Sequence, residues 1–195
     1  NLNPRIVDQV GRDAVDLNTG EFSAAARSFW SSQNDGNDTA AGGVAAQLPA
    51  SGSRNIYTYI GTSPGGTGVS LTSHPLSDGN ANITKALLGD AAMSGATRTE
   101  LLNYIRGMEP PSNTERKAIG SPIHSSPRLA TYSCITANVA DSSKCDEDDQ
   151  TAFIGSNEGF VHAFNTATGV EQFAFMPEEL LDNISKLKAN ASTSS

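Results

Sequence analysis

Charged and aromatic side chains are scarce in this sequence of 195 residues. Charged residues make up 17% of the chain and aromatic residues 6%, whereas glycine alone occurs 18 times. Helical cytosolic enzymes usually carry more charge, so the composition favours a turn-rich, extracellular β-protein. The formal net charge of −8 argues against a nucleic-acid partner, because phosphate binding needs clustered Lys and Arg.

Long apolar runs are also lacking. No stretch approaches the roughly 20 consecutive apolar residues of a membrane-spanning helix, so we expect no membrane span. The sequence shows neither an initiator Met nor a signal peptide, and we expect a mature or excised piece of a protein. Its length suffices for one domain with a hydrophobic core.

Cysteine occurs only twice, as Cys134 and Cys145. In a secreted protein these residues would pair and close a short loop, which contributes roughly 2–3 kcal/mol on the entropy model. The alternative is a pair of buried thiols in a reducing cell. The polar residues Asp141–Lys144 between the cysteines favour the disulfide, and we predict it.

The clearest secondary-structure pattern lies between residues 151 and 175. Three segments of strand length follow one another there: Thr151–Gly155, Phe160–Phe164 and Val170–Phe175. In the second segment Phe160, His162 and Phe164 fall on one face. Polar turns that end in glycine separate the segments, so we predict an antiparallel meander, the unit of sandwiches, barrels and propeller blades.

Other strands are predicted upstream of the meander. Ser121–Tyr132 would be a fourth strand that completes a four-stranded antiparallel unit. Arg54–Ile60 is a run of residues with high strand propensity. Phe22–Ser32 contains the only tryptophan, Trp30, and could be a strand that enters the core.

Helices are predicted at residues 82–89, 97–106 and 178–188. In the second of these, Thr97 and Glu100 have the spacing of a capping box, and Gly107 is placed to end the helix. In the third, leucine and isoleucine recur at helical spacing. We expect the tail that follows it to be mobile.

Several segments together resemble a known family. GSNEGFVHAFNTATGVEQFAFMP, residues 155–177, is similar to the blade motif of quinoprotein-type β-propellers, and more closely to the C-terminal propeller of the type IV pilus tip-associated proteins, the PilY/PilC family. The other matching segments follow the family's order and are DGNDTAAGGVAAQLP (Asp35–Pro49), RNIYTYIG (Arg54–Gly61), LLNYIRGMEP (Leu101–Pro110) and IGSPIHSSPRL (Ile119–Leu129). Together they span Trp30 to Leu181. Gly120-Ser121 departs from the family's Gly-Asp, so no role of that carboxylate is carried over.

The resemblance implies a mainly β fold, a partial β-propeller with one clear four-stranded antiparallel blade and helical insertions. Earlier strands could supply part of another blade. Residues 1–118 would form the first part of the propeller domain, with residues 97–106 as a helical insertion. Residues 119–188 would form the blade and a short helix, and residues 189–195 a flexible tail. The blade motif, with structural roles, would consist of Gly155, Asn157, Gly159, His162, Phe164, Gly169, Phe173 and Phe175.

A propeller has at least four blades, so this chain cannot close a ring by itself. We expect its open sheet edges to be capped by the rest of the propeller, by an insertion helix or by another chain.

No catalytic, metal or cofactor site is predicted. Gly61–Gly65 fits G-x-S-x-G, but the proline after its serine has no N–H for an oxyanion hole. His124 and His162 could lie on neighbouring strands as a weak metal pair, although hydrogen-bonded structural histidines are favoured. The acidic runs Asp35–Asp38 and Asp146–Asp149 lack the spacing of a calcium loop, and we interpret them as solvated turns or loops.

The family resemblance implies a non-enzymatic part of a pilus tip-associated adhesin and biogenesis factor. Such a protein supports type IV pilus biogenesis, attachment to host or abiotic surfaces and twitching motility, with pilins as partners. It would reach the pilus tip or outer surface of a Gram-negative bacterium through the periplasm. Calcium in this family belongs to an aspartate loop further along the propeller, so no cofactor is expected here. Two alternatives stay open, a fragment of a periplasmic quinone-dependent dehydrogenase and an outer-membrane assembly scaffold.

Overall fold

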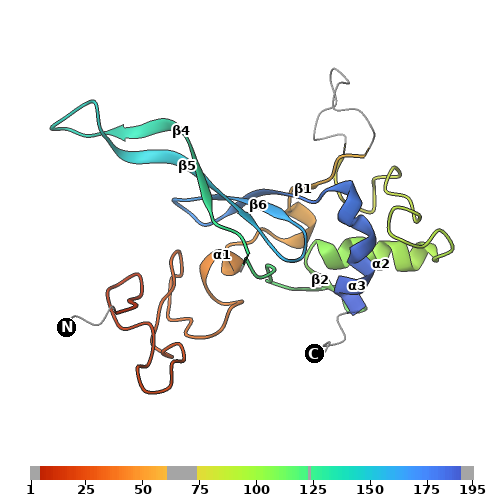
Figure 1. Ribbon diagram of the computed structural model, residues 1–195, viewed down its shortest axis with the longest axis horizontal. Coiled ribbons are helices and arrows are strands. Elements are labelled where there is room, and N and C mark those ends of the chain that lie inside the picture. The colour runs from red at the N-terminus through yellow and green to blue at the C-terminus, as the bar shows by residue number, and fades with distance from the viewer. Residues whose placement is uncertain (1–4, 61–73, 123, 190–195) are drawn as a thin grey trace.

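The computed structural model describes residues 5–60, 74–122 and 124–189, and in them the chain is mainly β (Figure 1). A five-stranded mixed sheet has the order β1-β7-β6-β5-β4, and β2 and β3 form a two-stranded sheet. Among these residues the sheets do not close into a ring or barrel.

The strands are β1 (Ile56–Tyr57), β2 (Met108–Glu109), β3 (Thr114–Glu115), β4 (Arg128–Ala137), β5 (Cys145–Gly155), β6 (Val161–Asn165) and β7 (Glu171–Phe175). The helices are α1 (Gly43–Ala46), α2 (Gly95–Ile105) and α3 (Ile184–Ala189), with the 3₁₀ helices η1 (Ser51–Ser53) and η3 (Glu178–Asn183).

The predicted antiparallel meander is present as β5, β6 and β7. β6 pairs with β5 over its whole length and with β7 on its other side. A register shift between Ala163 and Phe164 places Glu171 opposite Phe164. Glu171 therefore lies on the face of the sheet that carries His162.

The fourth strand begins later than predicted. The sequence pattern indicated Ser121–Tyr132, whereas β4 begins at Arg128 and continues to Ala137. Pro122 and Pro127 lie before this start, and proline has no N–H to donate to a ladder. β5 begins before the predicted Thr151 because its acidic first half pairs with β4, a case in which cross-strand pairing overrides low strand propensity.

The distal parts of β4 and β5 project from the body as a hairpin (Figure 1). The predicted disulfide is confirmed there, between Cys134 and Cys145, whose Cα atoms are 5.7 Å apart. Every β4 residue except Ala130 is exposed. The cross-link therefore reinforces an antiparallel ladder whose side chains are mostly exposed.

The fifth strand was not predicted to join this sheet. β1 pairs with β7 in parallel, with Ile56 opposite Ala174 and Tyr57 opposite Phe175. The strand predicted for residues 54–60 is only two residues long. The sheet is consequently mixed, and its last strand in sequence lies inside it rather than at its edge.

The hydrophobic core lies between the β1-β7-β6 end of the sheet and the helices α2, η3 and α3 (Figure 1). Ile56, Leu102, Met176 and Leu181 have almost no solvent exposure. Burial of one such side chain stabilises the fold by about 1.5–3 kcal/mol. Phe160, at the start of the predicted aromatic row, belongs to the same cluster.

The helix predicted for residues 97–106 is present as α2, which spans residues 95–105. Its N-cap is Ser94 and not Thr97, because the Ser94 hydroxyl accepts the N–H of Thr97 at 3.0 Å. Gly107 ends the helix as predicted, with φ at +99°, a left-handed conformation that glycine adopts freely.

Of the other two predicted helices, one is absent and one is present with a 3₁₀ first half. No helix forms over Asn82–Gly89, because only isolated turns such as Leu88 N–H to Lys85 O occur before Gly89, which has φ at +91°. The helix predicted for Glu178–Lys188 is present, but its first half is 3₁₀ (η3) and only its second half is α-helical (α3).

The N-terminal segment, residues 5–47, consists mostly of turns. The strand predicted for Phe22–Ser32 is wrong, since residues 23–32 form turns and coil and Phe29 is exposed. Trp30 has φ at +63°. This segment is held by short turns rather than by a sheet ladder, and it lies beside the β5-β6 part of the sheet.

Candidate interaction site

Three buried ionisable groups gather around the carboxylate of Glu171 in β7, counting Glu171 itself. Arg54, just before β1, donates from Nε to Oε2 of Glu171 at 2.7 Å and from Nη2 to Oε1 at 2.8 Å. Nδ1 of His162 lies 2.8 Å from the same Oε1. The side chains of Glu171, His162 and Arg54 are 0%, 1% and 4% exposed. This charge cluster is thus shielded from water, and its paired hydrogen bonds fix the geometry.

Arg106, at the end of α2, extends the charge cluster. Its Nη2 donates to the carbonyls of Ser51 and Arg54 at 2.9 and 2.8 Å. Burial lowers the pKa of Arg106, and the charge of Arg54 lowers it further. Burial acts to raise the pKa of Glu171, but the hydrogen bonds from His162 and Arg54 and the charge of Arg54 hold that pKa below its ordinary range.

The charge cluster holds the fold together. Both carboxylate oxygens of Glu171 are occupied by Arg54 and His162. Arg54, Arg106 and His162 come from three separate segments of the family resemblance, and the fold brings them to one place. His162 is buried and hydrogen-bonded, as predicted. The sequence reasoning missed Glu171, although an acid at the start of the aromatic strand β7 was a usable signal.

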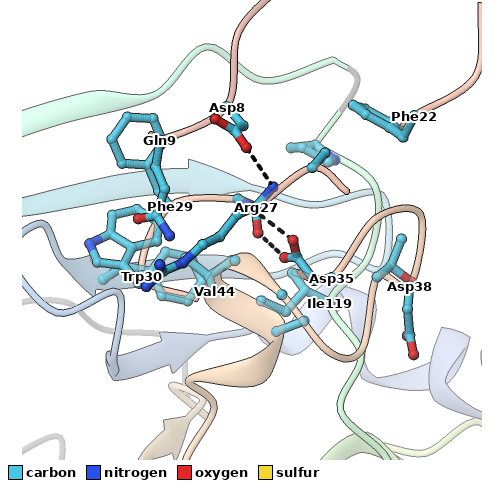
Figure 2. Close-up of a pocket in the computed structure, with 18 of the residues that line it drawn as sticks. Asp8, Gln9, Phe22, Arg27, Phe29, Trp30, Asp35, Asp38, Val44 and Ile119 are labelled. Atoms are coloured by element: carbon cyan, nitrogen blue, oxygen red, sulfur yellow. Dashed lines mark hydrogen bonds between the residues drawn. The ribbon is translucent and has the colours of Figure 1, made fainter. Parts of the chain in front are cut away.

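An apolar groove with a volume of about 850 Å³ lies between the N-terminal segment and the sheet. Figure 2 shows Phe22, Phe29, Val44 and Ile119 around it. Phe22 is 60% and Phe29 66% exposed. Exposed apolar side chains of this size, gathered at one place, mark an interaction surface.

Trp30 fixes the N-terminal wall of the groove against the sheet. Its Nε1 donates to the carbonyl of Thr166 at 2.9 Å, a contact between residues 136 positions apart. The indole lies against Gly169, where an added Cβ would meet the ring at 2.6 Å. Gly169 has φ at +72° as well, so both its conformation and the close approach of Trp30 require glycine.

A turn around Asp35 shapes the rim of the same wall. The Asp35 carboxylate accepts the N–H of Ser28 at 2.9 Å and the hydroxyl of Ser31 at 2.8 Å. Partial burial acts to raise the pKa of Asp35, but these hydrogen bonds hold it below its usual value. The acidic run Asp35–Asp38 is therefore a hydrogen-bonded turn, in line with the sequence interpretation.

The floor of the groove is a row of residues across three strands. Phe164 in β6 lies opposite Ala152 in β5, and Ala152 lies opposite Leu129 in β4. All three line the groove. The row ends at β4, the edge of the sheet, where Leu129 is 63% exposed.

The side chains of the blade motif divide between the two faces of the sheet. His162 and Phe164 are buried on one face, with their rings stacked at a centroid distance of 5.6 Å. Phe173 and Phe175 are half-buried on the other face, where Phe173 meets Phe153 edge-on at 6.2 Å.

The remaining motif residues lie in or beside the two hairpin turns. Gly159 has φ at +90° and lies against Leu180, where an added Cβ would come within 2.9 Å. The Asn157 N–H donates to the carbonyl of Ser121 at 2.9 Å. The Gly155 N–H donates to the hydroxyl of Ser125 at 2.8 Å. The assignment of these residues to a propeller blade stays a prediction.

The histidines do not form a metal centre in the described part of the chain. His124 is exposed, whereas His162 is buried against Glu171. Cys134, Cys145 and Asp148 form a close group, but both sulfur atoms belong to the disulfide and offer no thiolate. The G-x-S-x-G segment, residues 61–65, lies outside the described residues. In the ranges the structure covers, no helix is long and apolar enough to cross a bilayer.

Comparison with known proteins gives one relative for part of the chain. Over 110 residues the chain is 34% identical to the type IV pilus biogenesis factor PilY1 of Pseudomonas aeruginosa (strain UCBPP-PA14). The match covers 50% of this chain and 9% of that protein, so the chain corresponds to a small part of its relative. No protein-family model and no solved structure matches the chain. The match supports a PilY-like relationship for half of the sequence.

Proposed function

We propose that this chain is a non-enzymatic part of a type IV pilus biogenesis factor that is exposed outside a Gram-negative cell, at the pilus tip. The observation that carries the proposal is the 34% identity to a protein named as such a factor. Its pilus-related role is transferred at the level of the family. Pilins are the proposed partners, and attachment to surfaces and twitching motility are the proposed outcomes.

The charge cluster supports a scaffold role for the matching segments. Arg54 and Arg106 donate to Glu171 and to backbone carbonyls within the fold, and Nδ1 of His162 is hydrogen-bonded to Glu171. Residues in this arrangement stabilise a long-range contact, and the guanidinium groups of Arg54 and Arg106, which also border a small cleft, are engaged by Glu171 and backbone carbonyls. A buried structural cluster of this kind is compatible with a protein that displays surfaces and carries out no turnover.

We further propose that the sheet is one wedge of a larger β-propeller. Four antiparallel strands in a meander are the usual composition of a blade, and β4 to β7 supply them. The half-exposed aromatic side chains Phe153, Phe173 and Phe175 lie on the face that would meet a neighbouring blade.

In this proposal the sheet resists mechanical load while the loops and the N-terminal segment make contacts. The disulfide between Cys134 and Cys145 reinforces the projecting hairpin. Binding surfaces are commonly carried by loops on a rigid scaffold. The apolar groove and the hairpin are therefore the first places to look for contacts with pilus components.

Genetic deletion followed by complementation tests the proposed function. Deletion should reduce surface piliation, adhesion and twitching, and the intact gene should restore all three. A gene carrying Glu171→Gln should restore them poorly, whereas Glu179→Gln, the same change at an exposed site outside the groove and the hairpin, should restore them fully. Unchanged piliation, adhesion and twitching after deletion would refute the proposal. Reduction of a dye by the purified protein with added quinone and calcium would favour a dehydrogenase instead.

A further inference from the structure

The free edge of the large sheet is the outer side of β4. β4 ends the strand order, and every residue in it except Ala130 is exposed. The inner part of the strand, Arg128–Thr131, pairs with β5 in regular register, and the register shifts begin only after Thr131. Edge strands are commonly protected by charges, prolines or bulges. Arg128–Thr131 has one charge, no proline and no bulge, so its unpaired N–H and C=O groups are available to another strand.

The floor of the apolar groove leads to this same edge. The cross-strand row Phe164, Ala152 and Leu129 stops there, with Leu129 largely in solvent. Cross-strand neighbours on one face stabilise each other through side-chain contact. A further strand beside β4 would continue the row with its own apolar side chain and cover Leu129.

The distal half of the hairpin favours a positively charged partner segment. Four consecutive acidic residues, Asp146–Asp149, lie in β5, and the last three of them are opposite β4 residues from Ser133 to Thr136. In the described ranges no salt bridge reaches any of these four carboxylates, since the nearby Lys144 pairs with Asp141. A chain lying along β4 would therefore meet apolar surface near Leu129 and unneutralised negative charge further out.

We propose that the edge of β4 at Arg128–Thr131 binds an extended segment of another polypeptide by strand addition. The segment would place alternate apolar side chains over Leu129 and the groove, and Lys or Arg residues beside Asp146–Asp149. Main-chain hydrogen bonds supply affinity in this binding mode, and side-chain pockets on one face supply specificity. The inference goes beyond the proposed function, because the surface can be tested with synthetic peptides whatever the role at the pilus.

A second copy of this chain is the competing occupant. Two β4 edges could pair in an antiparallel sheet, but each chain carries a net charge of −8. Long-range repulsion between like-charged molecules opposes that association at low salt. A basic peptide segment has the opposite charge, so it is the occupant to which the proposal commits.

The test uses the whole chain and three synthetic peptides. The first alternates Val and Thr and ends in consecutive Lys residues. The second replaces the Lys residues with Glu, and the third places Pro at the centre of the alternating part. Binding is measured by fluorescence anisotropy, and the site is located by hydrogen exchange of backbone amides.

Two matched variants locate the interaction. Leu129→Lys puts a charge at the exposed end of the row, where folding tolerates it because the side chain is already in solvent. Val139→Lys makes the same change of charge at the tip of the hairpin, where the side chain is fully exposed and outside the groove. Thermal unfolding of both variants serves as the folding control.

We expect saturable binding of the Lys peptide, with slower exchange in Arg128–Thr131 and weaker binding at high salt. The Glu and Pro peptides should bind the parent chain at least about tenfold more weakly than the Lys peptide does. The Lys peptide should also bind Leu129→Lys at least about tenfold more weakly than it binds the parent chain. Its affinity for Val139→Lys should stay within about twofold of its affinity for the parent chain. Any of these results overturns the proposal: no saturable binding of the Lys peptide, protection confined to other residues, or self-association through β4 that Leu129→Lys abolishes. Strong protection, without any peptide, of those Arg128–Thr131 amides that point away from β5 also overturns it, because the edge would then already be covered.

Discussion

Replacement of Glu171 by Gln isolates the contribution of the charge cluster. The substitution keeps the size of the side chain but removes the charge that faces Arg54 at 2.7 and 2.8 Å. It leaves the Arg54 guanidinium, which is 4% exposed, without a counter-ion and close to Arg106. Removal of one partner of a buried ion pair typically costs 3–5 kcal/mol, so we expect a loss of about 4 kcal/mol in unfolding free energy.

That loss is large beside the total stability of a domain, about 5–15 kcal/mol. Urea unfolding followed by circular dichroism measures it. With a slope of about 2 kcal/mol per molar urea, the midpoint should fall by about 2 M. Glu147→Gln is the matched control, because Glu147 is exposed, and its midpoint should hardly move. A midpoint for Glu171→Gln that coincides with the control would refute the reasoning.

The same pair of proteins gives a pH dependence. The pKa of Glu171 is lower in the folded protein than the ordinary glutamate value. The ionised carboxylate therefore stabilises the fold fully above the ordinary pKa of about 4.3. This stabilisation is lost as the pH falls through the lower pKa of the folded protein. The difference in unfolding free energy between parent and Glu171→Gln should therefore be constant near neutral pH and shrink in acid. A difference that grows as the pH falls below about 4 would contradict the assigned direction of the shift.

Three further predictions concern separate elements. Replacing both cysteines by serine should cost about 2–3 kcal/mol if the hairpin unfolds with the domain, and hydrogen exchange should quicken in the distal parts of β4 and β5 while the core is unchanged. Gly169→Ala should displace the indole of Trp30, the only tryptophan, and shift its fluorescence emission to longer wavelength; Gly79→Ala, which meets no atom within 4 Å, should not. Ser94→Ala should lower stability by about 1 kcal/mol through loss of the N-cap, and a change within error in thermal unfolding would show that the hydroxyl does not cap α2.

The parts of the fold that were predicted correctly depend on local pattern. Period-two alternation and glycine-ending turns identified β5 to β7, and the apolar stripe and Gly107 identified α2. The disulfide followed from two cysteines with polar residues between them. Each of these signals lies within a few residues of the structure that it specifies.

The parts that were missed depend on distant partners. β1 is only two residues long and gains its place in the sheet from β7. The strand predicted for Phe22–Ser32 does not form, because hydrogen bonds within turns and the contact of Trp30 with Thr166 determine that segment. Where a residue has its partner far along the chain, intrinsic propensity is overridden by tertiary contacts.

The residues of the candidate site were also predicted only where the signal was local. His162 was expected to be a hydrogen-bonded structural histidine, and it is. Its partner Glu171, and the gathering of Arg54 and Arg106 beside it, could not be read from spacing, because the residues come from three parts of the sequence. The apolar groove was not predicted either, since its two walls lie far apart in the chain.

The parallel pairing of β1 with β7 has a consequence for how the chain matures. Arg54 and Glu171 are 117 residues apart, and a polypeptide leaves a ribosome or a secretion channel with its N-terminus first. The residues between them must therefore emerge before β1 can pair with β7, although Tyr57 has an earlier bridge partner in Pro75, and closing so long a loop is slow. We expect the pairing of β1 with β7, and the burial of the charge cluster that depends on it, to be a late step in folding.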